Sequence, residues 1–203
     1  MKIALIGASG NIGSKILAEA ATRGHHVTAI ARHPEKIAHA AHVTATAGDA
    51  QNPKELAGLL RGHDAVVSAL RFSSFDSAAL LAAVKAAGVN RFLAVGGAGS
   101  LELPDGSRVV DSPDFPEAWR PEAQKGVAFL GVLREETELD WTFLSPSALI
   151  APGKRTGVFR LGKDALLVDA DGKSHISEED YAVAMLDEIE QPRHIRARFT
   201  VGY

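Results

Sequence analysis

The sequence feature that most constrains the fold is a short apolar run that leads through three glycines into a helix. Lys2–Ile6 (KIALI) is apolar and β-branched, as is typical of a buried parallel strand. Gly7, Gly10 and Gly13 follow in the spacing G-x-x-G-x-x-G, and apolar residues then recur at helical spacing until Gly24. The pattern therefore predicts a strand, a tight turn and a helix in direct succession.

The predicted turn has the chemistry of a pyrophosphate site. It presents unpaired backbone N–H groups and the positive end of a helix, and both favour an anion. Gly7 allows the tight turn, Gly10 lets phosphates approach the backbone, and Gly13 lets the helix pack closely on the strand. We therefore predict that the turn binds a dinucleotide. The residues expected to contact it are Gly7, Ala8, Ser9, Gly10, Asn11 and Ile12.

The length and composition are those of one globular domain, residues 1–203. The net charge of −3 is not that of a nucleic-acid-binding surface. No apolar run approaches the roughly 20 residues of a membrane span, and the first run breaks too early, at Gly7, for a secretory signal. Cysteine is absent, which excludes disulfides and thiol chemistry. We expect a cytoplasmic protein whose partners are neither nucleic acids nor membranes.

Strand-like and helical segments alternate along most of the chain. The further predicted strands are His26–Ala31, Val43–Ala47, Ala65–Leu70, Arg91–Val95, Trp141–Leu144 and Arg198–Val201. The further predicted helices are Pro53–Gly62, Ser77–Ala87, Pro121–Thr137 and Glu178–Glu190. This alternation predicts an α/β fold with a doubly wound parallel sheet, a Rossmann fold with a small C-terminal extension. Right-handed crossovers then place the carboxyl ends of the strands along one crevice.

Two segments depart from the alternation. Leu101–Arg120 is irregular, rich in Pro, Asp and Ser, and too long for a simple connection, so we expect a lid over the substrate. Gly157–Leu161 and Ala165–Val168 are expected to pair with each other as a hairpin.

The residue at the end of the second predicted strand bears on cofactor choice. At this position an acidic side chain binds a ribose 2′-hydroxyl, whereas a basic one binds a 2′-phosphate. The sequence has Arg32 there, followed by His33, and no acidic residue before Glu35. We therefore predict binding of NADP, with NADPH preferred over NADH. In the alternative interpretation, Arg32 only ends a strand in solvent.

Other strand ends supply further candidate residues. Asp49 follows the third strand, where its carboxylate could accept from the adenine amino group, although Gly-Asp is also an ordinary turn pair. The fourth strand ends in small and apolar residues expected to line the crevice, namely Ser68, Ala69 and Leu70. The fifth strand ends at Gly96 and Gly97, on the side where a nicotinamide would lie. Phe72, Phe75 and Phe115 could stack on a flat ring or pack the lid.

Together these segments resemble the atypical short-chain dehydrogenase/reductases. Within them, the chain is most similar to the NAD(P)H-binding NADH-flavin reductases, relatives of biliverdin reductase B and NmrA-like proteins. The segments that carry the resemblance are GASGNIG (7–13), Gly48-Asp49, VVSAL (66–70), LAVGGAGSL (93–101), DWTFLSPSALIAPG (140–153) and GKSHISEEDYAVAMLDEIEQP (172–192). The resemblance implies an NADPH-type cofactor on the glycine turn, with Arg32 near the 2′-phosphate. It also implies that Pro146 and Ser147 lie beside the nicotinamide.

The chain departs from the wider superfamily at its catalytic pair, Tyr-x-x-x-Lys. Aligning on Lys125 puts Pro121 where the proton-donating tyrosine would be, and Gly97 where the superfamily has a serine. The only tyrosines are Tyr181 and Tyr203. Carbonyl reduction through a tyrosine acid is therefore not expected. A flavin or quinone does not need that acid, because hydride can pass by face-to-face stacking and the proton can come from solvent.

These observations predict an NADPH-dependent reductase for a flat small-molecule acceptor, such as free flavin, a quinone or an azo dye. A non-enzymatic NmrA-type redox sensor is the main alternative. A third possibility is reduction or isomerisation of a small sugar or isoflavone-like substrate, with Lys125 as the candidate base. Lys125 could equally touch the ribose or be a solvated helix lysine. No metal site is expected, because His39 and His42 lack a carboxylate partner at metal spacing.

Overall fold

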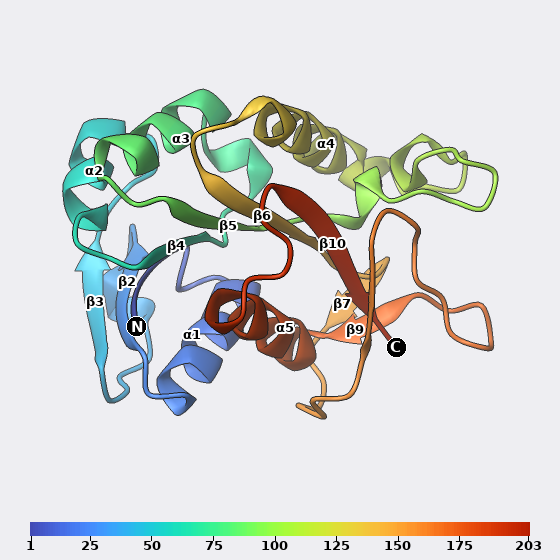
Figure 1. Cartoon of the computed structure of the whole chain (residues 1–203). Coiled ribbons are helices and arrows are strands. Elements are labelled where there is room, and N and C mark those ends of the chain that lie inside the picture. Colours follow the sequence, from blue (N-terminus) through green and yellow to red (C-terminus); the bar gives the residue numbers. More distant parts are fainter.

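The computed structural model describes residues 1–203 and consists of one large sheet covered by helices on both faces (Figure 1). The strands are β1 (Lys2–Ile6), β2 (His26–Ala31), β3 (Val43–Ala47), β4 (Ala65–Ser68), β5 (Arg91–Val95), β6 (Asp140–Ser145), β7 (Leu149–Ala151), β8 (Arg160–Gly162), β9 (His175–Ser177) and β10 (Ala197–Gly202). The α-helices are α1 (Asn11–Thr22), α2 (Pro53–Leu60), α3 (Ser77–Ala86), α4 (Arg120–Glu135) and α5 (Glu178–Glu190).

The sheet has eight strands in the order β3-β2-β1-β4-β5-β6-β10-β8. Every neighbouring pair is parallel except β10 and β8. The strand order reverses between β1 and β4, so a crevice opens there at the carboxyl ends of the strands. The predicted doubly wound α/β fold is therefore confirmed.

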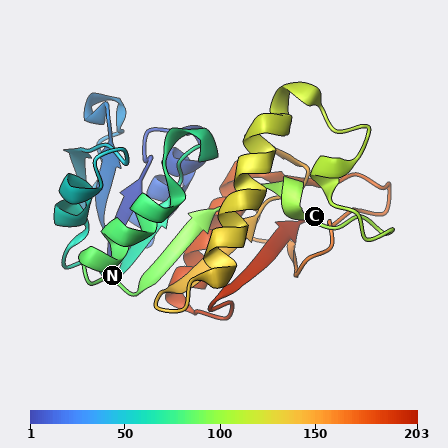
Figure 2. The same cartoon turned by 90° about the horizontal axis from the view of Figure 1, so that it is seen from above.

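Alternating side chains of the strands fill two separate cores. In β1, Ile3 and Leu5 pack with α1 and α5 on one face, whereas Ala4 and Ile6 pack with α2, α3 and α4 on the other. Successive side chains of a strand point to opposite faces, so a run that is apolar throughout must be buried on both. Figures 1 and 2 show these two helical layers on either side of the sheet.

The predicted hairpin near the C-terminus is wrong. β8 covers only Arg160–Gly162 and pairs antiparallel with β10, with Leu161 opposite Val201. Residues 165–168 form no strand, and β8 instead extends the large sheet at its edge beside β10. Ala165 instead bridges to Glu102. A second small sheet, β7 with β9, was not predicted either.

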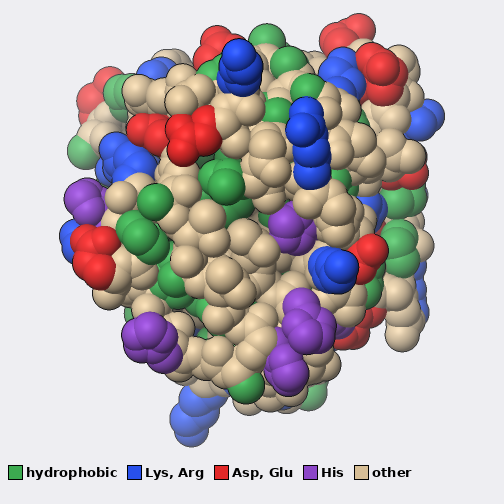
Figure 3. Space-filling view, turned by 90° about the vertical axis from the view of Figure 1, so that its left-hand side faces the viewer, with side chains coloured by type: hydrophobic (Ala, Val, Ile, Leu, Met, Phe, Trp, Pro, Cys, Tyr) green, Lys and Arg blue, Asp and Glu red, His purple; other side chains and the backbone are tan.

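The exposed surface mixes charges of both signs. Figure 3 shows the side where β3 forms the sheet edge, with acidic, basic and histidine side chains interspersed and hydrophobic ones scattered. His26 and His42 lie with their rings 4.7 Å apart. No helix is both long and apolar enough to cross a membrane.

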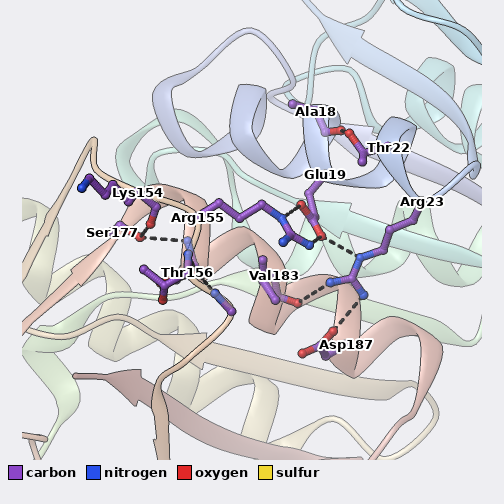
Figure 4. A network of polar contacts seen from close by, with 12 residues as sticks. Ala18, Glu19, Thr22, Arg23, Lys154, Arg155, Thr156, Ser177, Val183 and Asp187 are labelled. Carbon is purple, nitrogen blue, oxygen red and sulfur yellow. Dashed lines mark hydrogen bonds and ion pairs between the residues drawn. The ribbon is translucent and has the colours of Figure 1, made fainter.

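A buried carboxylate joins α1, α5 and the chain before β8 (Figure 4). Glu19 on α1 is 6% exposed and accepts from Arg23 at 2.8 Å and from Arg155 at 2.7 and 2.8 Å. Arg23 also donates to Asp187 of α5 at 2.8 Å and to the carbonyl of Val183. Glu19 and Arg23 together therefore link α1, α5 and the segment that carries Arg155.

We expect Glu19→Gln to lower the free energy of unfolding by about 2 kcal/mol, because it leaves Arg23 and Arg155 without their shared charge partner. Urea denaturation at neutral pH measures the loss. Glu138→Gln is the matched control: Glu138 is 72% exposed and pairs with Lys85 on the surface, so its loss should cost less than about 1 kcal/mol. Equal losses in the two variants would contradict a special role for Glu19.

The contribution of Glu19 to the stability of the fold should depend on pH. Hydrogen bonds from Arg155, and then from Arg23, lower the pKa of Glu19 below its usual value of 4.5. A carboxyl group whose pKa is lower in the folded state stabilises the fold fully above its usual pKa and loses that contribution as the pH falls through the folded one. The stability difference between wild type and Glu19→Gln should therefore shrink below about pH 4.5. A difference that stays constant into that range would contradict the pairing.

Candidate functional site

The turn between β1 and α1 requires glycine at two positions. Gly7 has φ +83°, and a Cβ there would lie 2.7 Å from the carbonyl oxygen of Ala69. A Cβ at Gly13 would lie 2.1 Å from the carbonyl oxygen of Gly7. The turn can thus form only because these residues lack side chains, and it brings the first turn of α1 up to the ends of β1 and β4.

The N-terminus of α1 is left open for an anion. The first N–H groups of a helix have no partner within it, and no side chain caps α1 or adds an acidic group to its first turn. Gly10 is the N-cap residue, with φ −77° and ψ 170°. A Cβ at Gly10 would contact only the Gly7 carbonyl oxygen, at 3.3 Å, so the space in front of the helix is free. This arrangement fits a pyrophosphate.

A hollow of about 190 Å³ lies in front of this turn, which we call the glycine-turn hollow. It lies where β1, β2, β3 and β4 end, at the predicted crevice. The predicted residues that line it are Gly7, Ser9, Gly10, Arg32, Asp49, Ala69 and Leu70. The ends of four neighbouring strands, β3, β2, β1 and β4, therefore meet around one space, as their order in the sheet requires.

Arg32 and Asp49 both face this hollow, but only the side chain of Asp49 is hydrogen-bonded to the protein. Arg32 follows the last residue of β2, is exposed, and makes no ion pair or side-chain hydrogen bond. One carboxylate oxygen of Asp49 accepts from the backbone N–H of Gln51 at 3.0 Å, as in an ordinary Asx turn. Its other oxygen has no protein partner, so the turn role does not prevent a contact with a ligand.

A second hollow of about 390 Å³, the aromatic hollow, adjoins the first, and Arg71 lines both. The predicted residues Gly96, Gly97, Pro146 and Ser147 lie here, at the ends of β5 and β6. The Ser147 hydroxyl donates to the carbonyl of Val201 at 2.9 Å and is thus held in the core. Aromatic side chains complete the walls, namely Phe72, Phe115 and Trp119.

The comparisons with known proteins bear on this pair of hollows. The chain matches the model of the NAD(P)H-binding family over residues 7–192. This protein belongs to the NAD(P)H-binding family.

Relatives match over their full length. YwnB of Bacillus subtilis (strain 168) is 41% identical over 209 residues, which cover 99% of this chain and 98% of YwnB. A structure from Bacteroides thetaiotaomicron named as a "putative epimerase" is 48% identical with a TM-score of 0.95, covering 100% of this chain and 96% of that one. A structure from Streptococcus pneumoniae TIGR4 named as a "putative NADH-flavin reductase" is 34% identical with a TM-score of 0.83, covering 100% and 99%. The resemblance to NAD(P)H-binding proteins, among them one named as an NADH-flavin reductase, is therefore confirmed.

Some predicted residues of this NAD(P)H-binding protein line neither hollow. They are Ala8, Asn11, Ile12, His33, Ser68 and Lys125. Ala8 and Ser68 are buried, and β4 ends at Ser68, two residues before the predicted strand end. His33 turns to Glu35, with 3.2 Å between ring nitrogen and carboxylate oxygen. Lys125 is exposed on α4 and pairs with no carboxylate.

Sequence reasoning missed three residues of the site. Arg71 follows β4, is 80% exposed, and lies between the two hollows. Glu122 on α4 accepts from the backbone N–H groups of Phe72 at 2.6 Å and Ser73 at 3.2 Å, which fixes the chain after β4. Trp119 is contributed by the irregular segment. Only Arg71 carried a usable signal, because it comes directly after the predicted strand Ala65–Leu70.

The irregular segment 101–120 forms one wall of the aromatic hollow, where the lid was predicted. It contains two short 3-10 turns, η4 (Val109–Asp111) and η5 (Glu117–Trp119). The guanidinium of Arg120 donates to the carbonyls of Val110 and Phe115, which holds the segment in a compact shape. Phe115 and Trp119 reach the hollow from it, as does Ala118. Phe75, by contrast, packs on Phe129 with ring centroids 5.1 Å apart.

Neither tyrosine lies in the aromatic hollow. Tyr181 on α5 is fully buried; its hydroxyl donates to the carbonyl of Leu144 at 2.6 Å and accepts from the N–H of Gly96 at 3.3 Å. Burial raises the pKa of Tyr181 far above its usual value. The Tyr203 hydroxyl donates to Asp180 at 2.6 Å. Tyr181 thus supports the end of β5 from behind, and no tyrosine can donate a proton into the hollow.

Proposed function

We propose that this protein is an NADPH-dependent reductase that transfers hydride to a flat acceptor such as a flavin, a quinone or an azo compound. The observation that carries the proposal is the composition of the aromatic hollow. Three aromatic side chains line it, and Arg71 and Glu122 are its only ionisable residues. The carboxylate of Glu122 is already engaged by backbone N–H groups. Such a site favours stacking of a flat ring over proton transfer to a carbonyl.

The residues of the glycine-turn hollow fit the dinucleotide. The open N-terminus of α1 and the bare backbone at Gly10 would hold the pyrophosphate, and Arg32 would pair with the 2′-phosphate. Gly97, Pro146 and Ser147 would lie against the nicotinamide. The bound cofactor supplies two electrons and one proton as hydride. The protein's part is to hold the two flat rings against each other and to exclude water from between them.

The proton balance does not require a side-chain acid. NADPH, one proton and the oxidised acceptor give NADP and the reduced acceptor, and the proton can come from solvent. The aromatic hollow adjoins the surface through the exposed side chains of Arg71 and Trp119. The absence of a tyrosine from the hollow is therefore compatible with reduction of a flavin or quinone.

The names of relatives point to two kinds of reaction, since one is called a flavin reductase and another an epimerase. Epimerisation needs groups that remove and return a proton. Lys125, the candidate base, is exposed and lines neither hollow. The geometry therefore favours reduction over isomerisation for this chain.

A dinucleotide sensor is the second candidate function, favoured by the same lack of a catalytic acid. A sensor would bind NADPH without oxidising it, whereas a reductase would oxidise it when an acceptor is present. NADPH oxidation by purified protein, with and without FMN or riboflavin and against a boiled control, separates the two. We expect decay of the nicotinamide absorbance that depends on added flavin and is faster with NADPH than with NADH. Tight NADPH binding without decay for any flavin would favour the sensor.

Replacing Arg32 tests the cofactor preference. We expect Arg32→Ala to weaken NADPH binding by about 10- to 100-fold, because a charge-assisted contact to a phosphate contributes about 1.5–3 kcal/mol. NADH binding should change by less than about twofold, since NADH has no 2′-phosphate. Arg61→Ala, at an exposed arginine outside the hollow, is the matched control. Isothermal titration with both cofactors measures the effect, and equal weakening of the two would contradict the role.

We further propose that the protein acts in the cytoplasm on a small-molecule acceptor, without a nucleic acid or membrane partner. The support is the net charge of −3 and the mixture of acidic and basic side chains on the face that Figure 3 shows.

A further inference from the structure

An apolar groove of about 340 Å³ extends from the aromatic hollow along the irregular segment. Leu103, Val109 and Pro116 line the groove but not the aromatic hollow. Phe115, Trp119 and Leu149 line both the groove and the aromatic hollow, so the two spaces adjoin at these side chains. A molecule bound in the hollow would reach the groove past these three side chains.

The groove exposes large hydrophobic side chains in an unusual concentration. Trp119 is 62% exposed and Leu149 is 57% exposed, and the two side chains lie at the same junction. Scattered exposed hydrophobic residues need no explanation, but adjoining ones in a depression mark a binding site. Because the depression opens from the acceptor's proposed position, its occupant is best explained as part of the acceptor itself.

The charge of the groove restricts that occupant further. Asp114 is its only charged residue, and no lysine, arginine or histidine lines it. A phosphate or carboxylate in the groove would meet a carboxylate without a compensating cation. The polar phosphorylated chain of FMN therefore does not fit this space, whereas an uncharged hydrocarbon chain does.

We propose that the acceptor is a quinone that carries an apolar side chain, with its ring in the aromatic hollow and its chain in the apolar groove. This inference rests on the proposed reductase function and narrows its substrate class. In the reaction, hydride from NADPH and one proton from solvent convert the quinone to the hydroquinone and NADPH to NADP. Leu103 then determines specificity, because it lines the groove but not the hollow that holds the reacting ring, and Trp119 and Leu149 lie where the ring and the chain join.

Binding can be measured without turnover, because the two tryptophans differ in exposure. Trp119 is open to the groove, whereas Trp141 is 3% exposed in the core. We expect menadione, which has no side chain, and its prenylated analogue to quench tryptophan emission, with the prenylated compound binding about tenfold more tightly. A Trp119→Phe variant should lose most of the quenching. Equal affinities for the two quinones would overturn the proposal.

Substitutions in the groove test whether its side chains cause the preference for the prenylated quinone. Leu103→Asp should abolish the tenfold preference, and Leu149→Asp, at a more exposed position, should do the same if Leu103→Asp fails to fold. Leu161→Asp is the matched control, because Leu161 is 48% exposed but lies on β8 outside the groove. It should keep the full preference. Loss of the preference in Leu161→Asp, or its survival in both groove variants, would overturn the assignment.

Steady-state reduction of the same two quinones with NADPH separates this inference from the proposed function. Turnover of both quinones with equal KM would retain the reductase and overturn the groove assignment. Preferential binding of the prenylated quinone without NADPH oxidation would retain the groove and overturn the reductase. Sedimentation tests the remaining occupant: a ligand-free dimer that buries Trp119 and dissociates in Leu149→Asp would show that a second copy fills the groove and overturn the proposal.

Discussion

Replacing Gly13 by alanine should destabilise the protein by at least about 3 kcal/mol. The new Cβ would lie 2.1 Å from the carbonyl oxygen of Gly7 and 3.2 Å from the Cα of Ala8. Both neighbours are backbone atoms, which cannot swing away as a side chain could. Relief requires α1 to move off β1, and α1 carries part of the core that packs on α5. Urea denaturation of the purified variant measures the loss.

A glycine elsewhere in a helix provides the matched control. Gly131 lies within α4, and a Cβ there would meet nothing within 4 Å. Gly131→Ala should be neutral or stabilise the protein by up to about 1 kcal/mol, since alanine favours helix more than glycine does. The expected difference in stability between Gly13→Ala and Gly131→Ala thus comes from the position of the glycine, because the substitution is the same. A Gly13→Ala protein as stable as Gly131→Ala would mean that the turn is not packed as described.

Replacing Gly10 by valine should abolish cofactor binding and leave the fold intact. The backbone of Gly10 is extended, with φ −77° and ψ 170°, a conformation that β-branched residues accept. The only contact of a Cβ would be 3.3 Å from the Gly7 carbonyl oxygen, so little has to move. The valine methyl groups would instead occupy the glycine-turn hollow, where the pyrophosphate is proposed to bind.

We expect the affinity of Gly10→Val for NADPH and for NADH to fall by more than about 100-fold, because both cofactors share the pyrophosphate. Gly10→Ala should give a smaller loss, and urea denaturation should show both variants folded. Calorimetric titration with each cofactor checks the prediction. A folded Gly10→Val protein that still binds either cofactor would show that the turn is not the site.

The parts of the fold that were predicted correctly are those in which a local pattern has one structural solution. An apolar run such as Lys2–Ile6 must be buried on both faces, and alternation with helices then implies a parallel sheet. β8 and β9 each have only three residues, too short to show a period. The position of β8 depends on the free edge of the large sheet beside β10, and that of β9 on its pairing with β7, and both are properties of the assembled fold. The predicted hairpin failed for this reason.

The candidate site likewise contains residues that could be predicted from the sequence and residues that could not. Residues at strand ends, such as Arg32 and Gly97, could be placed together from topology alone, because parallel strands end at one edge. Trp119 and Glu122 could not, since they reach the aromatic hollow through the compact folding of 101–120 and the start of α4. Lys125 was singled out by alignment to a superfamily pair, but the helix turns its side chain to solvent. Irregular segments have no period from which a direction can be predicted.

Direct transfer of hydride from bound NADPH is the central claim, and an anaerobic single-turnover experiment tests it most directly. NADPH and NADPH deuterated on each face of the reactive nicotinamide carbon are mixed with the protein and FMN or menadione, and the acceptor absorbance is followed. We predict protein-dependent reduction of the acceptor that is slowed by deuterium on one face only. Bound NADPH with acceptor reduction no faster than in buffer would contradict the account and indicate a sensor.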